Sequence, residues 1–193
     1  AGLPQSVSAQ TINRFCSSGL QAVASAADRI RLGEADLMIA AGAESMSMIP
    51  MLGRLSLNAE VFARDENIGI AYGMGLTAEK VAAQWKVTRE AQDAVALQSH
   101  QRAMKAIADG EFKDEMTPVE VVARFPNLAT GEQGTKTRTV DIDEGPRPDT
   151  SLEGLAKLRP VFAAKGSVTA GNSSQTSDGA GALIVASERA IKQ

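Results

Sequence analysis

The stretch "NRFCSSGLQAVASAADRIRLGEADLMIAAGAES", residues 13–45, decides the fold class of this sequence. Apolar residues at helical spacing predict a helix that starts near Ser17 and stops at Gly33. The following "DLMIAAGAES", residues 36–45, is an almost continuous apolar run, typical of a strand covered on both faces. Ahead of the helix, "VSAQTIN" at 7–13 alternates in a way that predicts a further strand. The three elements predict a βαβ unit and therefore an α/β fold.

The composition limits the class of protein. A chain of 193 residues with 44% apolar residues can bury a core, and one domain with a large insertion is the expected organisation. Twenty basic and 23 acidic residues give a net charge of -3, without a run of one sign that would suggest a nucleic-acid groove or a membrane tail. A single cysteine cannot build a disulfide framework, so a reducing, cytoplasm-like compartment fits best.

The pattern changes between Met46 and about Pro148, which indicates an insertion. Two polar helices are predicted there, one capped by Thr77 and one running from Thr88 to Asp109, before Gly110. A second apolar strand follows in "GALIVAS", residues 181–187, and is expected to pair beside the first. Since the chain begins without methionine and stops as a further helix starts, we expect it to be a piece of something larger.

The lone cysteine, Cys16, lies where the predicted strand gives way to the helix. Free backbone N–H groups and the positive end of the helix dipole favour a thiolate there. Ser17, Ser18 and Gly19 are small enough to let a substrate approach the sulfur. The sequence therefore offers Cys16 as a nucleophile. The alternative, a buried cysteine that packs as a small hydrophobe, stays open on position alone.

Cysteine nucleophiles usually work with a histidine, and the one histidine here is His100, in "LQSHQRA". Its neighbours on the predicted helix are polar. This favours a surface histidine over a Cys16–His100 dyad.

Five motifs, in their order and at their intervals, resemble those of thiolases and span nearly the whole chain. They are "NRFCSSGLQA", "AAGAESMSMIP", "GMGLTAEKVA", "LEGLAKLRPVF" and "VTAGNSSQTSDGAGA". The form "CSSGLQA" is more similar to degradative 3-ketoacyl-CoA thiolases, also named acetyl-CoA acyltransferases, than to the biosynthetic acetoacetyl type.

The resemblance implies a layered αβαβα fold of two similar halves, with a loop domain inserted into the first half over coenzyme A. About half of such a chain is present, namely the later part of the N-terminal half and its inserted loop domain. The implied boundaries are 1–45 for the βαβ part with the nucleophile, 46–148 for the loop domain, and 149–193 for its end and the return to the N-terminal half with a final strand. The family's Gly-His-Pro histidine, its second cysteine and an asparagine motif of the oxyanion hole belong to the other half.

Residue by residue, the resemblance implies that Cys16 takes the acyl group, that Arg147 contacts the 3′-phosphate end of coenzyme A, and that Ser174 hydrogen-bonds the pantetheine arm. The apolar positions that flank the same arm are Met74, Phe162 and Ala170. The ordinary alternatives are a solvated arginine, a turn-forming serine and core packing. Gly73 stands where acetoacetyl-type thiolases often carry histidine, and the smaller residue fits a longer acyl chain.

The function implied by the resemblance is cleavage of a 3-ketoacyl-CoA by coenzyme A, through an acyl-cysteine, as in fatty-acid β-oxidation. The alternatives are a non-catalytic module that binds coenzyme A or forms dimers, and a condensing enzyme acting on carrier-protein thioesters. The family needs no metal and no cofactor, since coenzyme A is a substrate. The implied partners are acyl-CoA, coenzyme A and further copies in a homodimer or homotetramer, with no nucleic acid and no membrane. The implied location is the cytoplasm of a bacterium or an organelle matrix in a eukaryote.

Overall fold

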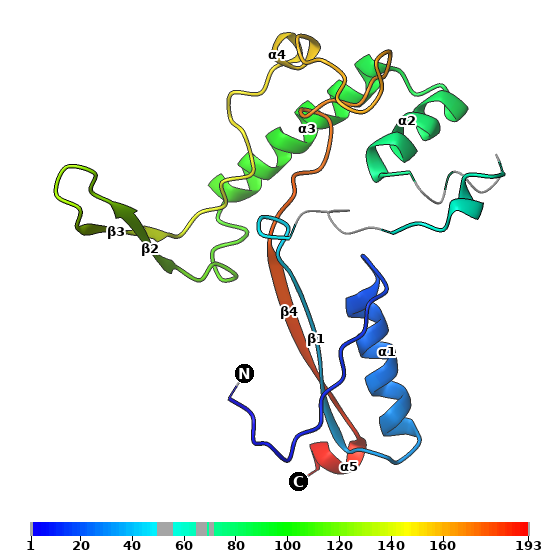
Figure 1. Ribbon diagram of the computed structural model, residues 1–193, viewed down its shortest axis with the longest axis vertical. Helices are drawn as coiled ribbons and strands as arrows, with labels where there is room; N and C mark the ends of the chain where they lie inside the picture. Colours follow the sequence, from blue (N-terminus) through cyan, green and yellow to red (C-terminus); the bar gives the residue numbers. More distant parts are fainter. Residues whose placement is uncertain (1, 50–55, 65–68, 70–71, 193) are drawn as a thin grey trace. The chain divides into compact units, whose positions relative to one another are not determined.

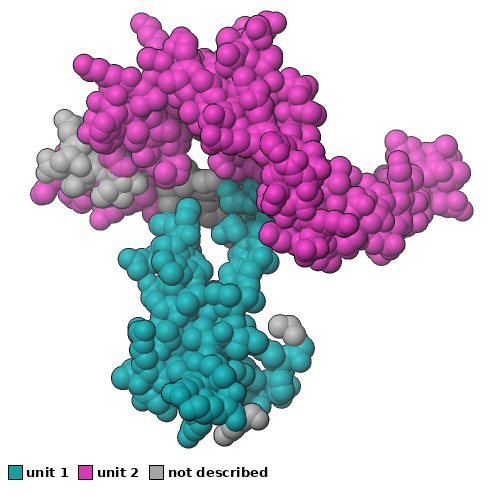
Figure 2. Space-filling view, turned by 180° about the vertical axis from the view of Figure 1, so that it is seen from behind, with its two compact units in different colours: residues 1–55, 176–193 teal, residues 56–175 magenta. Residues whose placement is uncertain are grey.

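The computed structural model describes residues 2–49, 56–64, 69 and 72–192. The chain forms two compact units, residues 1–55 with 176–193, and residues 56–175 (Figure 2). The sequence places its changes of organisation at residues 45 and 148, whereas the units divide at 55 and 175. Among the helices of the described ranges, none has the length and apolar character needed to cross a membrane.

In the first unit, helix α1 (Ser18–Arg31) lies along an antiparallel strand pair, β1 (Leu37–Glu44) and β4 (Gly179–Ala186) (Figure 1). This confirms the predicted helix, the apolar strand after it, and the pairing of "GALIVAS" beside that strand. The small residues Ala26 and Ala40 are buried and let the helix and strand pack closely. The core of this unit therefore lies between α1 and one face of the strands.

The other face of the strand pair is open within this chain. Ile39 and Ile184 lie opposite each other in the ladder and are 54% and 72% exposed. Alternate side chains of a strand point to opposite faces, so α1 covers only one set of them. The nearly continuous apolar run predicts a strand that is covered on both faces. Among the described residues, however, only one face is covered.

Hydrogen bonds from two serines close both ends of the strand pair. At one end, Ser187 donates from its N–H to the carbonyl of Asp36 and from Oγ to the Asp36 carboxylate, both at 2.8 Å. At the other, Asp178 accepts from the N–H of Ser47 at 2.8 Å and from its Oγ at 2.5 Å. The bonds from Ser47 hold the pKa of the Asp178 carboxyl below its usual value. Helix α5 (Glu188–Ile191) begins directly after Ser187.

The strand predicted at 7–13 is wrong for this structure, because those residues form no strand. A strand is held by hydrogen bonds to a neighbour, and in the described residues β1 and β4 pair only with each other. The alternation at 7–13 therefore has no ladder to join here.

The second unit is built around α3 (Arg89–Ala108), with α2 (Met74–Trp85), the short α4 (Leu152–Ala156) and a 3-10 turn, η1 (Ala59–Val61). The prediction for α3 is confirmed at both ends. Thr88 is its N-cap and accepts the N–H of Ala91 at 3.2 Å, and Gly110 adopts a φ of 77° after its last turn. The buried residue of α3 is Asp93.

The predicted cap of α2 is wrong. The helix begins at Met74 with Gly73 as N-cap, so Thr77 lies one turn inside it. There the Thr77 hydroxyl donates back to the carbonyl of Gly73 at 3.4 Å, as threonine does within helices.

A hairpin of β2 (Val119–Pro126) and β3 (Gln133–Val140) was not expected from the sequence. Every residue of β2 is exposed, so the hairpin lacks the half-buried alternation that marks a strand. The ring of Phe125 covers Gly134, where a Cβ would lie 2.7 Å from the ring. The aromatic side chain thus takes the space that glycine leaves open.

Candidate active site

Cys16 lies exposed in a tight turn, just ahead of Ser17, the N-cap of α1. Ser17 Oγ donates to the carbonyl of Arg14 at 2.8 Å. Ser18 Oγ donates to the carbonyl of Phe15 at 2.7 Å and accepts the N–H of Arg14 at 2.8 Å. These bonds join the residues on both sides of Cys16, so a closed turn presents the thiol. The alternative of a buried, packing cysteine does not hold for this chain.

The backbone just before the thiol is strained. Phe15 has a φ of 48°, in the left-handed region that bulky residues rarely adopt, and its side chain is 83% exposed. The Oδ1 of Asn13 accepts the Phe15 N–H at 2.9 Å and helps to hold this conformation. A sharp, strained turn ahead of a helix is a known way to present a nucleophile.

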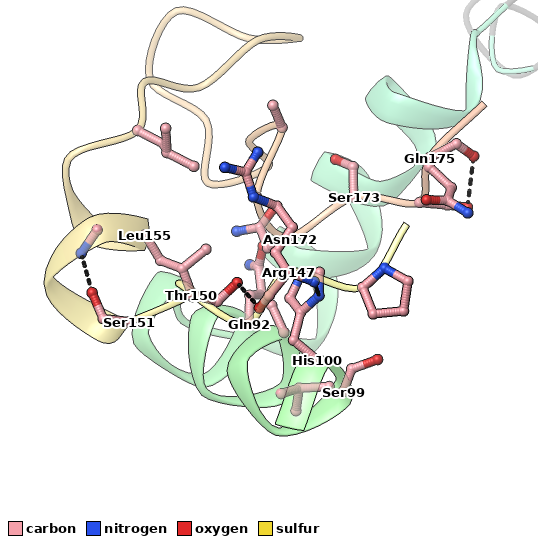
Figure 3. A pocket seen from close by; sticks show the side chains of 18 of the residues that line it. Gln92, Ser99, His100, Arg147, Thr150, Ser151, Leu155, Asn172, Ser173 and Gln175 are labelled. Atoms are coloured by element: carbon pink, nitrogen blue, oxygen red, sulfur yellow. Dashed lines mark hydrogen bonds between the residues drawn. The ribbon is translucent and has the colours of Figure 1, made fainter. Parts of the chain in front are cut away.

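A cleft of about 1110 Å³ opens in the second unit, between α3, the loop around Arg147, the start of α4 and the turn 170–175 (Figure 3). Three residues that the sequence assigned to ligand binding line it together: Arg147, Ala170 and Ser174. Ala170 and Ser174 are exposed, and Ser174 Oγ donates to the carbonyl of Gln175 at 3.1 Å. Apolar side chains of α3 form the opposite wall, for example Val95.

Arg147 carries the positive charge of the cleft. Its Nε and Nη2 lie 3.4 and 3.3 Å from the carboxylate oxygens of Asp149, which raises the pKa of the Arg147 guanidinium and lowers that of the Asp149 carboxyl. The Arg147 side chain is 68% exposed, so an anionic group in the cleft can reach it. Its backbone N–H donates to Nδ1 of His100 at 3.1 Å.

A buried polar network holds the turn that carries Ala170 and Ser174. Asp93 accepts from Nε of Arg89 at 2.7 Å and from Nδ2 of Asn172 at 2.9 Å. The Oδ1 of Asn172 accepts the N–H of Thr169, which is fully buried, at 2.7 Å. A buried ion pair keeps its geometry when its remaining donors and acceptors are satisfied, as they are here. The network thereby sets the position of the cleft wall.

Residues 1–189 match the model of the thiolase N-terminal domain. The chain belongs to the thiolase family.

Relatives and solved structures agree with this assignment. The chain is 49% identical to the 3-ketoacyl-CoA thiolase of Bacillus subtilis and 48% identical to the peroxisomal 3-ketoacyl-CoA thiolase 1 of Arabidopsis thaliana, with 96% of this chain covered in each case. Human mitochondrial 3-ketoacyl-CoA thiolase in complex with CoA superposes with a TM-score of 0.74 at 39% identity, over 99% of this chain and 48% of that one. The dimeric peroxisomal thiolase of Saccharomyces cerevisiae gives a TM-score of 0.73 at 36% identity.

The thiolase-like α/β fold expected from the motifs is therefore confirmed. The chain spans about half the length of the curated relatives it matches, 47% of the Bacillus protein and 41% of the Arabidopsis protein. The expectation that about half of a thiolase chain is present agrees with this coverage.

The two remaining predicted positions of this thiolase domain, Met74 and Phe162, lie near each other in the second unit but do not line the cleft. The ring of Phe162 rests on Gly75, directly after Met74, where any Cβ would collide with the ring. Phe162 and Met74 are 46% and 71% exposed, so both present apolar surface.

Sequence reasoning missed the residues that position this thiolase cleft: Glu79, Arg89, Asp93 and Asn172. A signal was available for two of them, since Arg89 and Asp93 are spaced i,i+4 on the predicted helix. Asn172 lies inside the motif "VTAGNSSQTSDGAGA", two residues before Ser174. No local pattern indicates Glu79, because its partner Ser167 lies 88 residues later in the chain.

Glu79 holds the segment that leads into the cleft turn. Its carboxylate accepts the N–H of Ser167 at 2.9 and 3.0 Å, the N–H of Val168 at 2.9 Å and the Ser167 hydroxyl at 3.2 Å. The carboxylate lies so close to Gly166 that no other residue fits there without moving it. Burial raises the pKa of the Glu79 carboxyl, but the hydrogen bonds outweigh burial and leave the pKa below its usual value.

Replacing Glu79 with glutamine should lower the free energy of unfolding by about 1 kcal/mol at pH 7, because hydrogen bonds to a charged acceptor are weakened. Folding lowers the pKa of the Glu79 carboxyl. Its contribution to the free energy of unfolding is therefore complete above the pKa of the unfolded state, about 4.3, and is lost as the pH falls through the pKa of the folded state. The stability difference between the parent and Glu79→Gln should therefore shrink below about pH 4.5. Denaturant unfolding of the full-length protein at pH 7, 5 and 3.5 measures it. Glu111→Gln, at an exposed position, is the matched control, and a difference independent of pH would contradict the expectation.

Proposed function

We propose that the full-length protein carrying this chain is a degradative thiolase. It cleaves a 3-ketoacyl-CoA with coenzyme A into acetyl-CoA and an acyl-CoA two carbons shorter, through an acyl-cysteine at Cys16. The observation that carries the proposal is the exposed Cys16 in a closed, strained turn, within a chain that matches the thiolase N-terminal domain.

The chemistry needs a thiol at this place. The Cys16 thiolate attacks the 3-keto carbon, the bond between carbons 2 and 3 breaks, and its electron pair leaves with the acetyl-CoA carbanion, which takes up a proton. The thiolate of a second coenzyme A then attacks the acyl-cysteine, and the Cys16 thiolate leaves. No electrons are gained or lost overall, so we expect no redox cofactor, and coenzyme A enters as a substrate.

The cleft in the second unit is the proposed place of coenzyme A. Arg147 suits a phosphate because its planar guanidinium stays charged and presents several donors. Ser174 and Ala170 would meet the pantetheine arm, and Met74 and Phe162 would supply apolar surface to it. The relatives include bacterial and peroxisomal thiolases, so we propose a bacterial cytoplasm or an organelle matrix as the location. We also propose a homodimer or a homotetramer, in line with the dimeric yeast structure.

The proposal is tested by mixing the full-length protein with a 3-ketoacyl-CoA and coenzyme A and following the loss of the 3-keto substrate. Acetyl-CoA and a shortened acyl-CoA should appear in equal amounts over many turnovers. Binding of coenzyme A without turnover would favour the non-catalytic alternative. Activity on carrier-protein thioesters alone would favour a condensing enzyme.

The role of Arg147 can be tested separately. Changing Arg147 to alanine should weaken coenzyme A binding roughly ten- to a hundredfold, the range for a hydrogen bond to a charged group, and less at high salt. Isothermal titration with coenzyme A and with dephospho-CoA, which lacks the 3′-phosphate, measures it. If the change weakened both ligands equally, the assignment of Arg147 to the 3′-phosphate would be wrong.

A further inference from the structure

His100 occupies a place in the cleft that the proposed function does not use. It lies half-buried on α3, and its Nδ1 accepts the backbone N–H of Arg147 at 3.1 Å (Figure 3). The other hydrogen bonds of Arg147 stay within its own loop, to Thr150 and Asp149. Among the described residues, the bond to His100 is thus the one that joins Arg147 to a helix of the unit.

The geometry points to His100 as a positioning residue for Arg147. An N–H that donates to Nδ1 requires a lone pair there, so the imidazole is neutral and carries its proton on Nε2. In this form His100 anchors the backbone of Arg147 to the rigid α3, and the guanidinium is held at the cleft. This inference rests on the proposed function, since it assigns to His100 the task of presenting Arg147 to a phosphate of coenzyme A.

Two substitutions of similar shape separate the acceptor from packing. His100→Asn keeps an acceptor oxygen near the position of Nδ1, whereas His100→Leu has a similar branch without one. In the full-length protein at pH 8, His100→Leu should weaken coenzyme A binding about three- to tenfold, as for one lost hydrogen bond. His100→Asn should bind within about twofold of the parent. Binding of pantetheine, which lacks the phosphates, should be unchanged in both variants.

The comparison of the two variants provides a readout that a purely structural role would not change, because His100→Asn restores the acceptor and His100→Leu does not. Equal binding of coenzyme A by the Asn and Leu variants would overturn the inference, as would an equal loss of pantetheine binding.

Arg147→Ala distinguishes failure of the His100 role from failure of the proposed coenzyme A site. If it weakens coenzyme A binding while His100→Leu does not, only the role of His100 is overturned. If Arg147→Ala itself leaves binding unchanged, the proposed site for coenzyme A fails and the role of His100 fails with it.

Discussion

Changing Cys16 to alanine should abolish thiolysis of 3-ketoacyl-CoA by the full-length protein, with a loss of at least about a thousandfold in kcat. Without the sulfur no acyl-enzyme can form, so the two-step route is closed and only uncatalysed attack remains. Steady-state assays measure the loss. Mass spectrometry of protein quenched with substrate and no coenzyme A should show the acyl group on the parent and none on Cys16→Ala.

Two controls make this result specific. Cys16→Ser keeps the size of the side chain and should be almost as inactive, because a serine hydroxyl without an adjacent base is a poor nucleophile at neutral pH. Both variants should still bind coenzyme A like the parent, since the proposed ligand cleft belongs to the other unit. Substantial turnover by Cys16→Ala would exclude the acyl-cysteine mechanism.

A protein of only these 193 residues should show no sustained thiolysis and form at most a slow acyl adduct on Cys16. The one histidine of the sequence is His100, whose Nδ1 accepts a hydrogen bond from the backbone N–H of Arg147. Catalytic groups act as a unit, so a nucleophile without its acid, base and full oxyanion hole loses several orders of magnitude in rate. A single-turnover experiment with a 3-ketoacyl-CoA, followed by repeated additions of coenzyme A, measures it.

The same protein should also associate in solution. Ile39 and Ile184 form part of an apolar strand face that α1 leaves exposed, and such surfaces drive self-association. Light scattering against concentration detects it. Many turnovers from protein whose intact mass confirms this length would contradict the expected absence of sustained thiolysis and would restore His100 as a candidate base.

Local patterns in the sequence were sufficient for several elements. The helix before Gly33, the apolar strand after it, and α3 between Thr88 and Gly110 all follow from periodicity and end signals. The motif around Cys16 was also sufficient to propose the nucleophile, because small residues ahead of an amphipathic helix are a local feature. Errors arose where the outcome depends on a neighbour. The strand at 7–13 has no ladder to join in this chain, and the cap of α2 moved to Gly73, one turn ahead of Thr77.

The sequence by itself determined the family, and it was sufficient to propose Cys16 as the nucleophile and to name residue types suited to coenzyme A, since each is carried by a short run of letters. Only tertiary structure could bring Arg147, Ala170 and Ser174 into one cleft. The side chains that hold this cleft are far apart along the chain: Asp93 meets Asn172, 79 residues later, and Glu79 meets Ser167, 88 residues later. The physical reason is that a buried carboxylate is stable only where the folded chain delivers donors to it, and no local pattern records which distant N–H groups will arrive.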